Sequence, residues 1–294
     1  MTKALISIEE FKSLAASQPV VIIDTRSPDA YAAGHIAGAV NVHEIFTYLA
    51  TSTMDGLMEL KGKFAEAFGA AGLSGAETAV IYEQSMNSGF GQSCRGYYLL
   101  QFLGYPKATV LHGGLDGWVK AGGALTMTPS KPMPKTFPID PSASAIMMDA
   151  QATLAALSKP GVAIIDVRDV DEWVGTSSSP YGPDFCPRKG RLPGAKWLEW
   201  YRMMKPSAAG PMFKSSDEIL AECATVGVTQ DTPVVLYCFK GARASNTYVA
   251  LKEAGVKDVK MYFGSWNEWS RDPSLPIEEG HPAMEKKPLM QSVA

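Results

Sequence analysis

A cysteine stands between an apolar run and a helix-like segment in the stretch YCFKGARASNTYVAL, residues 237–251. Residues 232–237 are β-branched and apolar, which predicts a buried strand, and the composition of residues 244–253 predicts a helix. The turn between them contains Cys238, Phe239, Lys240, Gly241, Ala242 and Arg243. A thiol, two cations and a glycine on one strand-to-helix turn are the parts of a nucleophilic site.

The chemistry expected of this turn is that of a stabilised thiolate. Carboxyl ends of strands in open α/β sheets face the crevice where ligands bind, and backbone N–H groups at a helix N-terminus favour an anion. Lys240 and Arg243 add positive charge, which favours the reactive thiolate form of Cys238. The alternative is a small buried core cysteine beside two solvated surface cations. The grouping of these residues favours the nucleophile.

Length and composition exclude several classes of function. A chain of 294 residues is long for one core, so two domains are expected. A net charge of −3 provides no positive electrostatic potential that would attract nucleic acid or an anionic membrane surface. Residues 1–14 carry charges where a signal peptide needs an apolar core, and no stretch reaches the roughly 20 apolar residues of a membrane span. The 4 scattered cysteines suit a reducing compartment, so a cytoplasmic location is predicted.

The sequence repeats itself in two halves. Residues 19–42 resemble residues 161–175 continued by 190–198, and residues 100–118 resemble residues 250–269. In each half, short β-branched runs alternate with helical patterns, which predicts βαβ units. The expected fold class is therefore α/β, with a mostly parallel sheet flanked by helices in each half.

Composition also marks the domain boundaries. We expect one domain at residues 1–125 and another at 145–272, joined by a proline-rich, semi-extended linker at 126–144. Residues 273–294 are expected to form a C-terminal tail over the surface. The segment 176–190, called the insertion below, has no counterpart in the first half. Long loops of this kind inside compact domains are often functional.

The combined motifs resemble the tandem-domain rhodaneses, the family of thiosulfate and 3-mercaptopyruvate sulfurtransferases. The matching motifs are the two IID-x-R strands, GHIAGAVNV and its partner GRLPGAKWL, the loop CFKGAR and the late GSWNEW. They run in the family's order from about residue 20 to residue 269. The resemblance implies two rhodanese-like domains, of which the first is non-catalytic and the second catalytic. Cys238 ends the strand in the second half, whereas Glu83 ends it in the first.

The resemblance also implies a mechanism. The Cys238 thiolate takes the outer sulfur of a small anionic donor as a persulfide, which passes to cyanide, a low-molecular-weight thiol or a protein thiol. The active loop, with Phe239, Gly241 and Ala242, stabilises both anions through its N–H groups, and no metal or organic cofactor is needed. Lys240 and Arg243 are expected to attract the charge of the donor. Lys240 resembles a lysine of the thiosulfate enzymes, so thiosulfate is the predicted donor and 3-mercaptopyruvate the alternative.

Two residues depart from the family's pattern. Arg243 stands where the two-domain enzymes usually carry threonine, and Glu172 stands where they tend to carry a donor-binding arginine. We therefore expect Arg188, in the insertion, and Arg191 to supply the missing charge. The alternative is that both are solvated surface residues.

Other polar residues are predicted to hold the structure. Asp24 and Asp166 are expected to cap turns, and the arginines two positions after them to pair with nearby acids or carbonyls. Cys94 matches Ser245 in the repeat, which places it on a helix as an inert thiol. Cys186 is expected to fill a gap, with resolution of a persulfide as the alternative.

The cysteine loop is also compatible with two other functions. Some cell-cycle dual-specificity phosphatases resemble the rhodanese fold and use a cysteine loop that ends in arginine. Their loop has five residues between cysteine and arginine, whereas 4 residues separate Cys238 from Arg243, which favours a smaller sulfur centre. The second alternative is a sulfur-relay protein that hands its persulfide to a protein partner.

Overall fold

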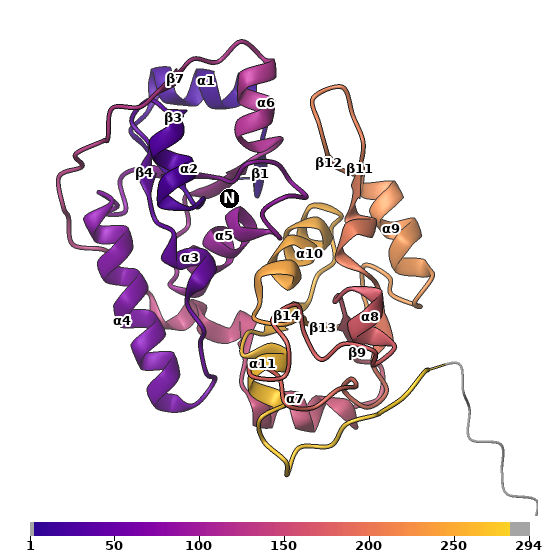
Figure 1. Ribbon diagram of the computed structural model, residues 1–294. Helices are drawn as coiled ribbons and strands as arrows, with labels where there is room; N and C mark the ends of the chain where they lie inside the picture. Colours follow the sequence, from indigo (N-terminus) through magenta and orange to yellow (C-terminus); the bar gives the residue numbers. More distant parts are fainter. Residues whose placement is uncertain (1–2, 283–294) are drawn as a thin grey trace, which may run out of the picture.

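A computed structural model describes residues 3–282 and shows two α/β units that follow the two halves of the sequence (Figure 1). The first unit contains a five-stranded parallel sheet in the order β1-β6-β5-β2-β4. Its strands are β1 (Leu5–Ile6), β2 (Val20–Asp24), β4 (Val40–Asn41), β5 (Thr78–Tyr82) and β6 (Ala108–Leu111). Its helices are α1 (Ile8–Ser17), α2 (Pro28–Ala33), α3 (Glu44–Thr47), α4 (Met54–Ala70), α5 (Gln92–Phe102) and α6 (Gly114–Lys120). The short strands β3 (His35–Ile36) and β7 (Leu125–Thr126) form a separate antiparallel pair.

The second unit repeats this plan, with a five-stranded parallel sheet in the order β10-β9-β13-β14-β8. Its strands are β8 (Met147–Met148), β9 (Ala163–Asp166), β10 (Lys196–Trp197), β13 (Val234–Tyr237) and β14 (Val259–Tyr262). Its helices are α7 (Ala150–Leu157), α8 (Val170–Trp173), α9 (Ser216–Ala224), α10 (Ala242–Glu253) and α11 (Ser265–Trp269). The 3₁₀ helices η1 (Pro141–Ile146) and η2 (Trp200–Met203) and the hairpin β11 (Met204–Lys205) and β12 (Met212–Phe213) complete it. The predicted α/β fold with two mostly parallel sheets is confirmed.

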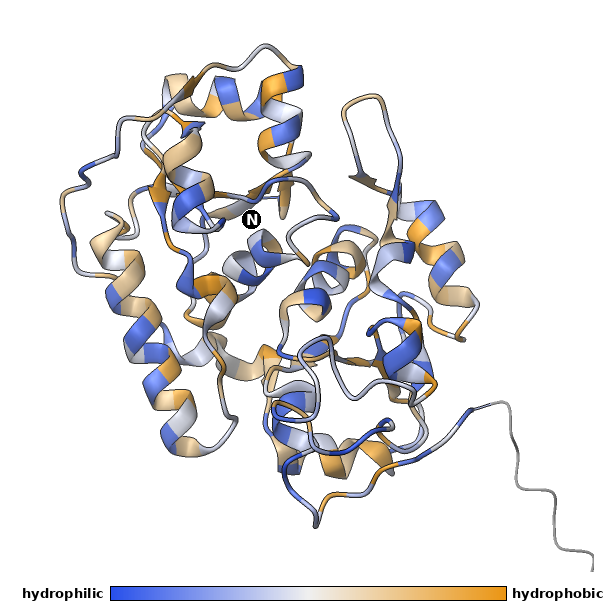
Figure 2. Ribbon diagram, in the orientation of Figure 1, coloured by the Kyte–Doolittle hydropathy of each residue, from blue (hydrophilic) through white to orange (hydrophobic). Residues whose placement is uncertain are grey.

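The two units share one apolar core. Helices α5 and α10 lie against each other in the middle of the molecule (Figure 1). Across this contact the Tyr98 ring meets the Tyr248 ring edge-on at 5.0 Å and stacks on the Phe263 ring at 5.7 Å. Outer helices bury one side only: in α4, Leu60, Phe64 and Phe68 face inward, and Figure 2 shows apolar and polar residues alternating along it. The shared core fixes the first unit against the turn that follows β13.

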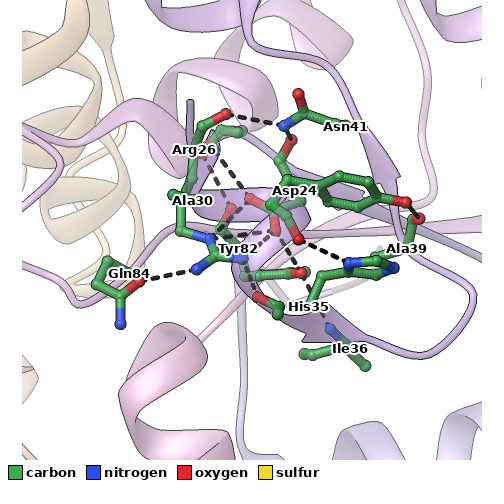
Figure 3. A network of polar contacts seen from close by, with 12 residues as sticks. Asp24, Arg26, Ala30, His35, Ile36, Ala39, Asn41, Tyr82 and Gln84 are labelled. Carbon is green, nitrogen blue, oxygen red and sulfur yellow. Dashed lines mark hydrogen bonds and ion pairs between the residues drawn. The ribbon is translucent and has the colours of Figure 1, made fainter. Parts of the chain in front are cut away.

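The IID-x-R motifs form buried polar corners, one in each unit. In the first unit, Arg26 donates to both carboxylate oxygens of Asp24, and the Tyr82 hydroxyl donates to the same carboxylate at 2.6 Å (Figure 3). In the second unit, Arg168 binds Asp166 in the same way. Each aspartate also accepts the backbone N–H two residues on. The predicted turn-capping and pairing roles of these residues are confirmed.

The end of the described chain lies along the second unit. Arg191 and Glu278 exchange two backbone hydrogen bonds, and Leu275 is buried. The predicted tail continues to residue 294, and its part from 283 onward lies outside the described residues. None of the helices within residues 3–282 is both long and apolar enough to cross a membrane.

Candidate active site

The cysteine turn joins a fully buried strand, β13, to the first turn of helix α10. Gly241 has a left-handed φ of 88°, and a Cβ on it would lie 2.9 Å from the Phe263 ring, so this position requires glycine. The N–H of Gly241 points at the Cys238 sulfur from 3.1 Å, and the N–H of Cys238 donates to the Ser265 hydroxyl. An amide directed at the sulfur stabilises it as an anion.

Both units and the insertion build a cavity over Cys238. It encloses about 320 Å³ including its open mouth. The turn contributes Cys238, Phe239, Lys240, Ala242 and Arg243, the first unit Phe46 and Phe90, and the insertion Pro180 and Tyr181. The Cys238 side chain is buried, with 1% exposure. Because the walls combine four aromatic rings with two cationic side chains and the space is small, the cavity suits a small anionic sulfur compound.

Lys240 brings a buried cation into this cavity. Its side-chain nitrogen lies 4.0 Å from the centre of the Phe46 ring and 5.5 Å from that of Tyr181. Burial lowers the pKa of Lys240 to about 8, Arg95 and Arg243 act in the same direction, and Cys238 opposes them. Within residues 3–282, no carboxylate or carbonyl oxygen binds this ammonium group. The ammonium group is therefore available to an anionic ligand next to the Cys238 sulfur.

Arg243 also lines the cavity, but its charge is already paired. Its guanidinium group binds both carboxylate oxygens of Glu172, at 2.5 Å and 3.1 Å, and one oxygen of Asp169 at 3.0 Å. The side chains of Arg243 and Glu172 are 4% and 1% exposed, respectively. The two departures from the family's pattern are thus bound to each other in the structure.

The structure does not bring Arg188 and Arg191 to the cavity. The guanidinium group of Arg188 donates to four backbone carbonyl groups between residues 269 and 275. Arg191 binds the Glu278 carboxylate at 3.3 Å and the Gly280 carbonyl at 2.8 Å. Both arginines bind residues 269–280 and neither lines the cavity. Their positions therefore do not support the expected role in donor binding.

Arg95 and Phe46 are site residues that sequence reasoning missed. Arg95, on α5, is fully buried and donates to the carbonyls of Ile45, Phe46 and Tyr48 at 2.8–3.0 Å. It therefore fixes the segment whose Phe46 ring contacts Lys240. Burial lowers the pKa of Arg95 to about 10, and its interaction with Cys238 acts in the opposite direction. One signal in the sequence could have pointed to Arg95. It directly follows Cys94 on α5, the helix that the repeat matches with α10.

Cys94 and Cys186 are not among the residues that line the cavity. Cys94 is on α5, as predicted, and burial raises its pKa well above the usual value. Cys186 is fully buried in the insertion, where burial likewise raises its pKa. Thiols held in the neutral form are poor nucleophiles, so Cys238 remains the candidate.

The matching turn of the first unit carries a carboxyl group in place of the thiol. Glu83 is fully buried and accepts hydrogen bonds from the Gln92 N–H at 3.0 Å and from the Ser93 hydroxyl at 3.1 Å. Burial raises the pKa of Glu83 from 4.5 to about 7. The first unit thus has the buried carboxyl group of Glu83 at the position where the second unit has the Cys238 thiol.

The variant Glu83→Gln is expected to gain stability relative to the wild type as the pH rises. Because the folded pKa of about 7 exceeds the ordinary 4.5, the wild type loses stability as the pH rises through this interval, by about 3 kcal/mol in total. Glutamine does not ionise, so the difference in unfolding free energy between variant and wild type should grow from pH 4.5 to pH 8. Denaturant unfolding at both pH values measures it, and a pH-independent difference would contradict the assignment.

Comparison with known proteins identifies the family. The profile of the Rhodanese-like domain matches residues 7–121 and again residues 149–272. The chain belongs to the rhodanese family. It is 30% identical to a thiosulfate sulfurtransferase of Pseudomonas aeruginosa over 88% of this chain and 91% of the relative. It is 29% identical to the sulfur carrier protein TtuD of Thermus thermophilus, over 85% and 87% of the two chains.

Solved structures agree on the fold. The wild-type structure of EanB superposes with a TM-score of 0.81 at 24% identity, covering 95% of this chain and 70% of that one. The prediction of two rhodanese-like domains is confirmed. The chain belongs to the sulfurtransferase class of enzymes.

Proposed function

We propose that this rhodanese is a thiosulfate sulfurtransferase of the thiosulfate:cyanide type, which carries the sulfur as a persulfide of Cys238. One observation carries the proposal: one small cavity contains a buried thiol, an amide aimed at it, and the ammonium of Lys240, which no acid within residues 3–282 pairs. The name of the Pseudomonas aeruginosa relative supports the choice of donor. Four free cysteines fit the predicted reducing, cytoplasmic environment.

The first half-reaction loads the enzyme. The Cys238 thiolate attacks the outer sulfur of thiosulfate, the sulfur–sulfur bond of the donor breaks, and sulfite leaves with the electron pair. A Cys238 persulfide anion remains, so charge and atoms balance without a proton. The Gly241 N–H, 3.1 Å from the sulfur, stabilises the attacking anion, and Lys240 offsets the charge of the donor.

The second half-reaction unloads it. Cyanide attacks the outer sulfur of the persulfide, thiocyanate forms, and the Cys238 thiolate is regenerated. A thiol acceptor would take the sulfur in the same way as a persulfide. The product of each half-reaction leaves before the other substrate enters, which gives ping-pong kinetics. None of these steps requires a metal or an organic cofactor.

A protein thiol is the second candidate acceptor, which would make the protein a sulfur relay. Phe90 and Tyr181 line the cavity and are 41% and 46% exposed, so an approaching chain could contact them. The relative TtuD is named a sulfur carrier. Both candidates share the persulfide on Cys238.

The test is to mix the purified protein with thiosulfate alone and to measure its intact mass. We expect a gain of one sulfur atom, located on Cys238 by peptide mapping, and its loss as thiocyanate when cyanide is added. Absence of the adduct would overturn the proposal. Release of phosphate from aryl phosphates faster than any sulfur uptake would instead identify a phosphatase.

A further inference from the structure

Two cations line the cavity around Cys238, but they differ in what already binds them. Lys240 faces aromatic rings, whereas Arg243 is held by two carboxylates. Counted by charge, Arg243 together with Glu172 and Asp169 contributes one positive and two negative charges. The cation nominally best suited to a doubly charged oxyanion is therefore neutralised before any donor arrives.

Local structure places Glu172 in this position. It lies in the single turn of α8, directly after the IID-x-R corner of β9, and its Oε2 also accepts the N–H of Asp169 at 3.3 Å. Arg243 is in the first turn of α10. Glu172 does not line the cavity, so it reaches the reaction only through Arg243.

The pairing is firm because both partners are buried. Burial by itself lowers the pKa of Arg243, but Glu172 reverses this effect and raises it above the ordinary value. Burial raises the pKa of Glu172, and Arg243 counteracts that rise. If Arg243 turned toward a donor, the buried Glu172 would lose its hydrogen-bonded ion-pair partner and keep only its more distant interaction with Arg168, which is unfavourable. Arg243 is thus retained by Glu172.

We propose that Glu172 is a specificity-determining residue that sets the charge preference for the sulfur donor. By holding Arg243, it leaves Lys240 as the one cavity cation that the described part of the chain does not pair. It thereby limits the affinity for doubly charged donors such as thiosulfate relative to singly charged ones. This inference rests on the proposed function, because it concerns the donor that loads Cys238. Its consequence is that wild-type thiosulfate use lies below the maximum that the cavity could support.

Two donors of similar chemistry but different charge test this inference. Thiosulfate carries two negative charges and releases sulfite, whereas methanethiosulfonate carries one and releases methanesulfinate, each giving the same Cys238 persulfide. In Glu172→Gln we expect kcat/KM for thiosulfate to rise about tenfold, while kcat/KM for methanethiosulfonate changes less than about threefold. In a ping-pong reaction this constant reports the loading step alone. An unchanged ratio of the two constants would overturn the inference.

A matched set of variants separates charge from structural damage. In Glu172→Gln combined with Arg243→Met the released cation is gone, so the ratio of the two constants should return toward the wild-type value. Asp169→Asn removes the negative charge of the more exposed partner of Arg243, whose side chain is 29% exposed. It should shift the ratio of the two constants in the same direction as Glu172→Gln, by about threefold. It serves as the test if Glu172→Gln does not fold. A general distortion of the cavity would lower both constants in parallel, which also counts against the inference.

Failure of the proposed function gives a different result. If the wild type is loaded by neither donor, the proposal of a Cys238 persulfide fails. If the wild type is loaded by both donors and none of the variants alters their ratio, the persulfide mechanism stands and the role assigned to Glu172 falls.

Discussion

Replacing Cys238 with serine is expected to lower sulfur transfer from thiosulfate at least about a thousandfold and to prevent the mass gain of one sulfur atom. A serine hydroxyl is a far weaker nucleophile at neutral pH and cannot form a persulfide. The side chain is similar in size and can still accept the Gly241 N–H that now reaches the sulfur at 3.1 Å. The fold should therefore be retained, with a melting temperature close to that of the wild type.

Cys94→Ala is the matched control for this variant. Cys94 is buried on α5, and its raised pKa keeps the thiol neutral. Sulfur transfer by this variant should stay within about twofold of the wild type, since no step uses that thiol. A loss comparable to that of Cys238→Ser, with the fold intact, would move the reaction centre away from Cys238. Iodoacetamide labelling followed by peptide mapping checks the same point independently.

The arrangement of strands and helices was predictable because each signal is local. The β-branched run before Cys238 predicted a strand at 232–237, and β13 occupies Val234–Tyr237. The helix predicted at 244–253 begins two residues earlier, at Ala242. Gly241, in its left-handed conformation, leads directly into the helix, and propensity alone does not show that. The repeat then extended the same architecture to both halves.

The partners of charged residues were not predictable in this way. Arg188 and Arg191 were expected to serve the donor, yet backbone carbonyls and a carboxylate from residues 269–280 bind them. Arg95 belongs to the first unit and was missed, because its relation to the cysteine turn arises only when α5 packs against α10. Contacts between residues so distant in sequence depend on tertiary packing, which carries no periodic signal in a single sequence.

Glu172 and Arg243 illustrate the same limit. Each could be recognised from the sequence as a departure from the family's pattern, but taken separately they have opposite implications: one removes a cation from the site and the other adds one. The structure joins them in an ion pair with its shortest contact at 2.5 Å, so the net change in the cavity is small. The net charge available to a donor depends on pairing as well as on composition.

Lys240→Met is expected to lower kcat/KM for thiosulfate about fiftyfold, because it removes the one cation of the cavity that the described residues leave unpaired. Methionine is unbranched, apolar and only slightly shorter than lysine, so the cavity should keep its shape. Use of 3-mercaptopyruvate, tested side by side, should fall less. An equal loss with both donors would undercut thiosulfate as the preferred one.

The pH dependence provides a second readout for Lys240. Its pKa of about 8 means that the ammonium is present below pH 8 and is lost as the pH rises through that value. The kcat/KM of the wild type for thiosulfate, which reports ionisations of the free enzyme, should therefore decline above pH 8. Lys240→Arg retains its charge and should shift this decline to higher pH, whereas Lys240→Met should abolish it. A decline that persists unchanged in Lys240→Met would assign the ionisation to another group and remove Lys240 from the donor site.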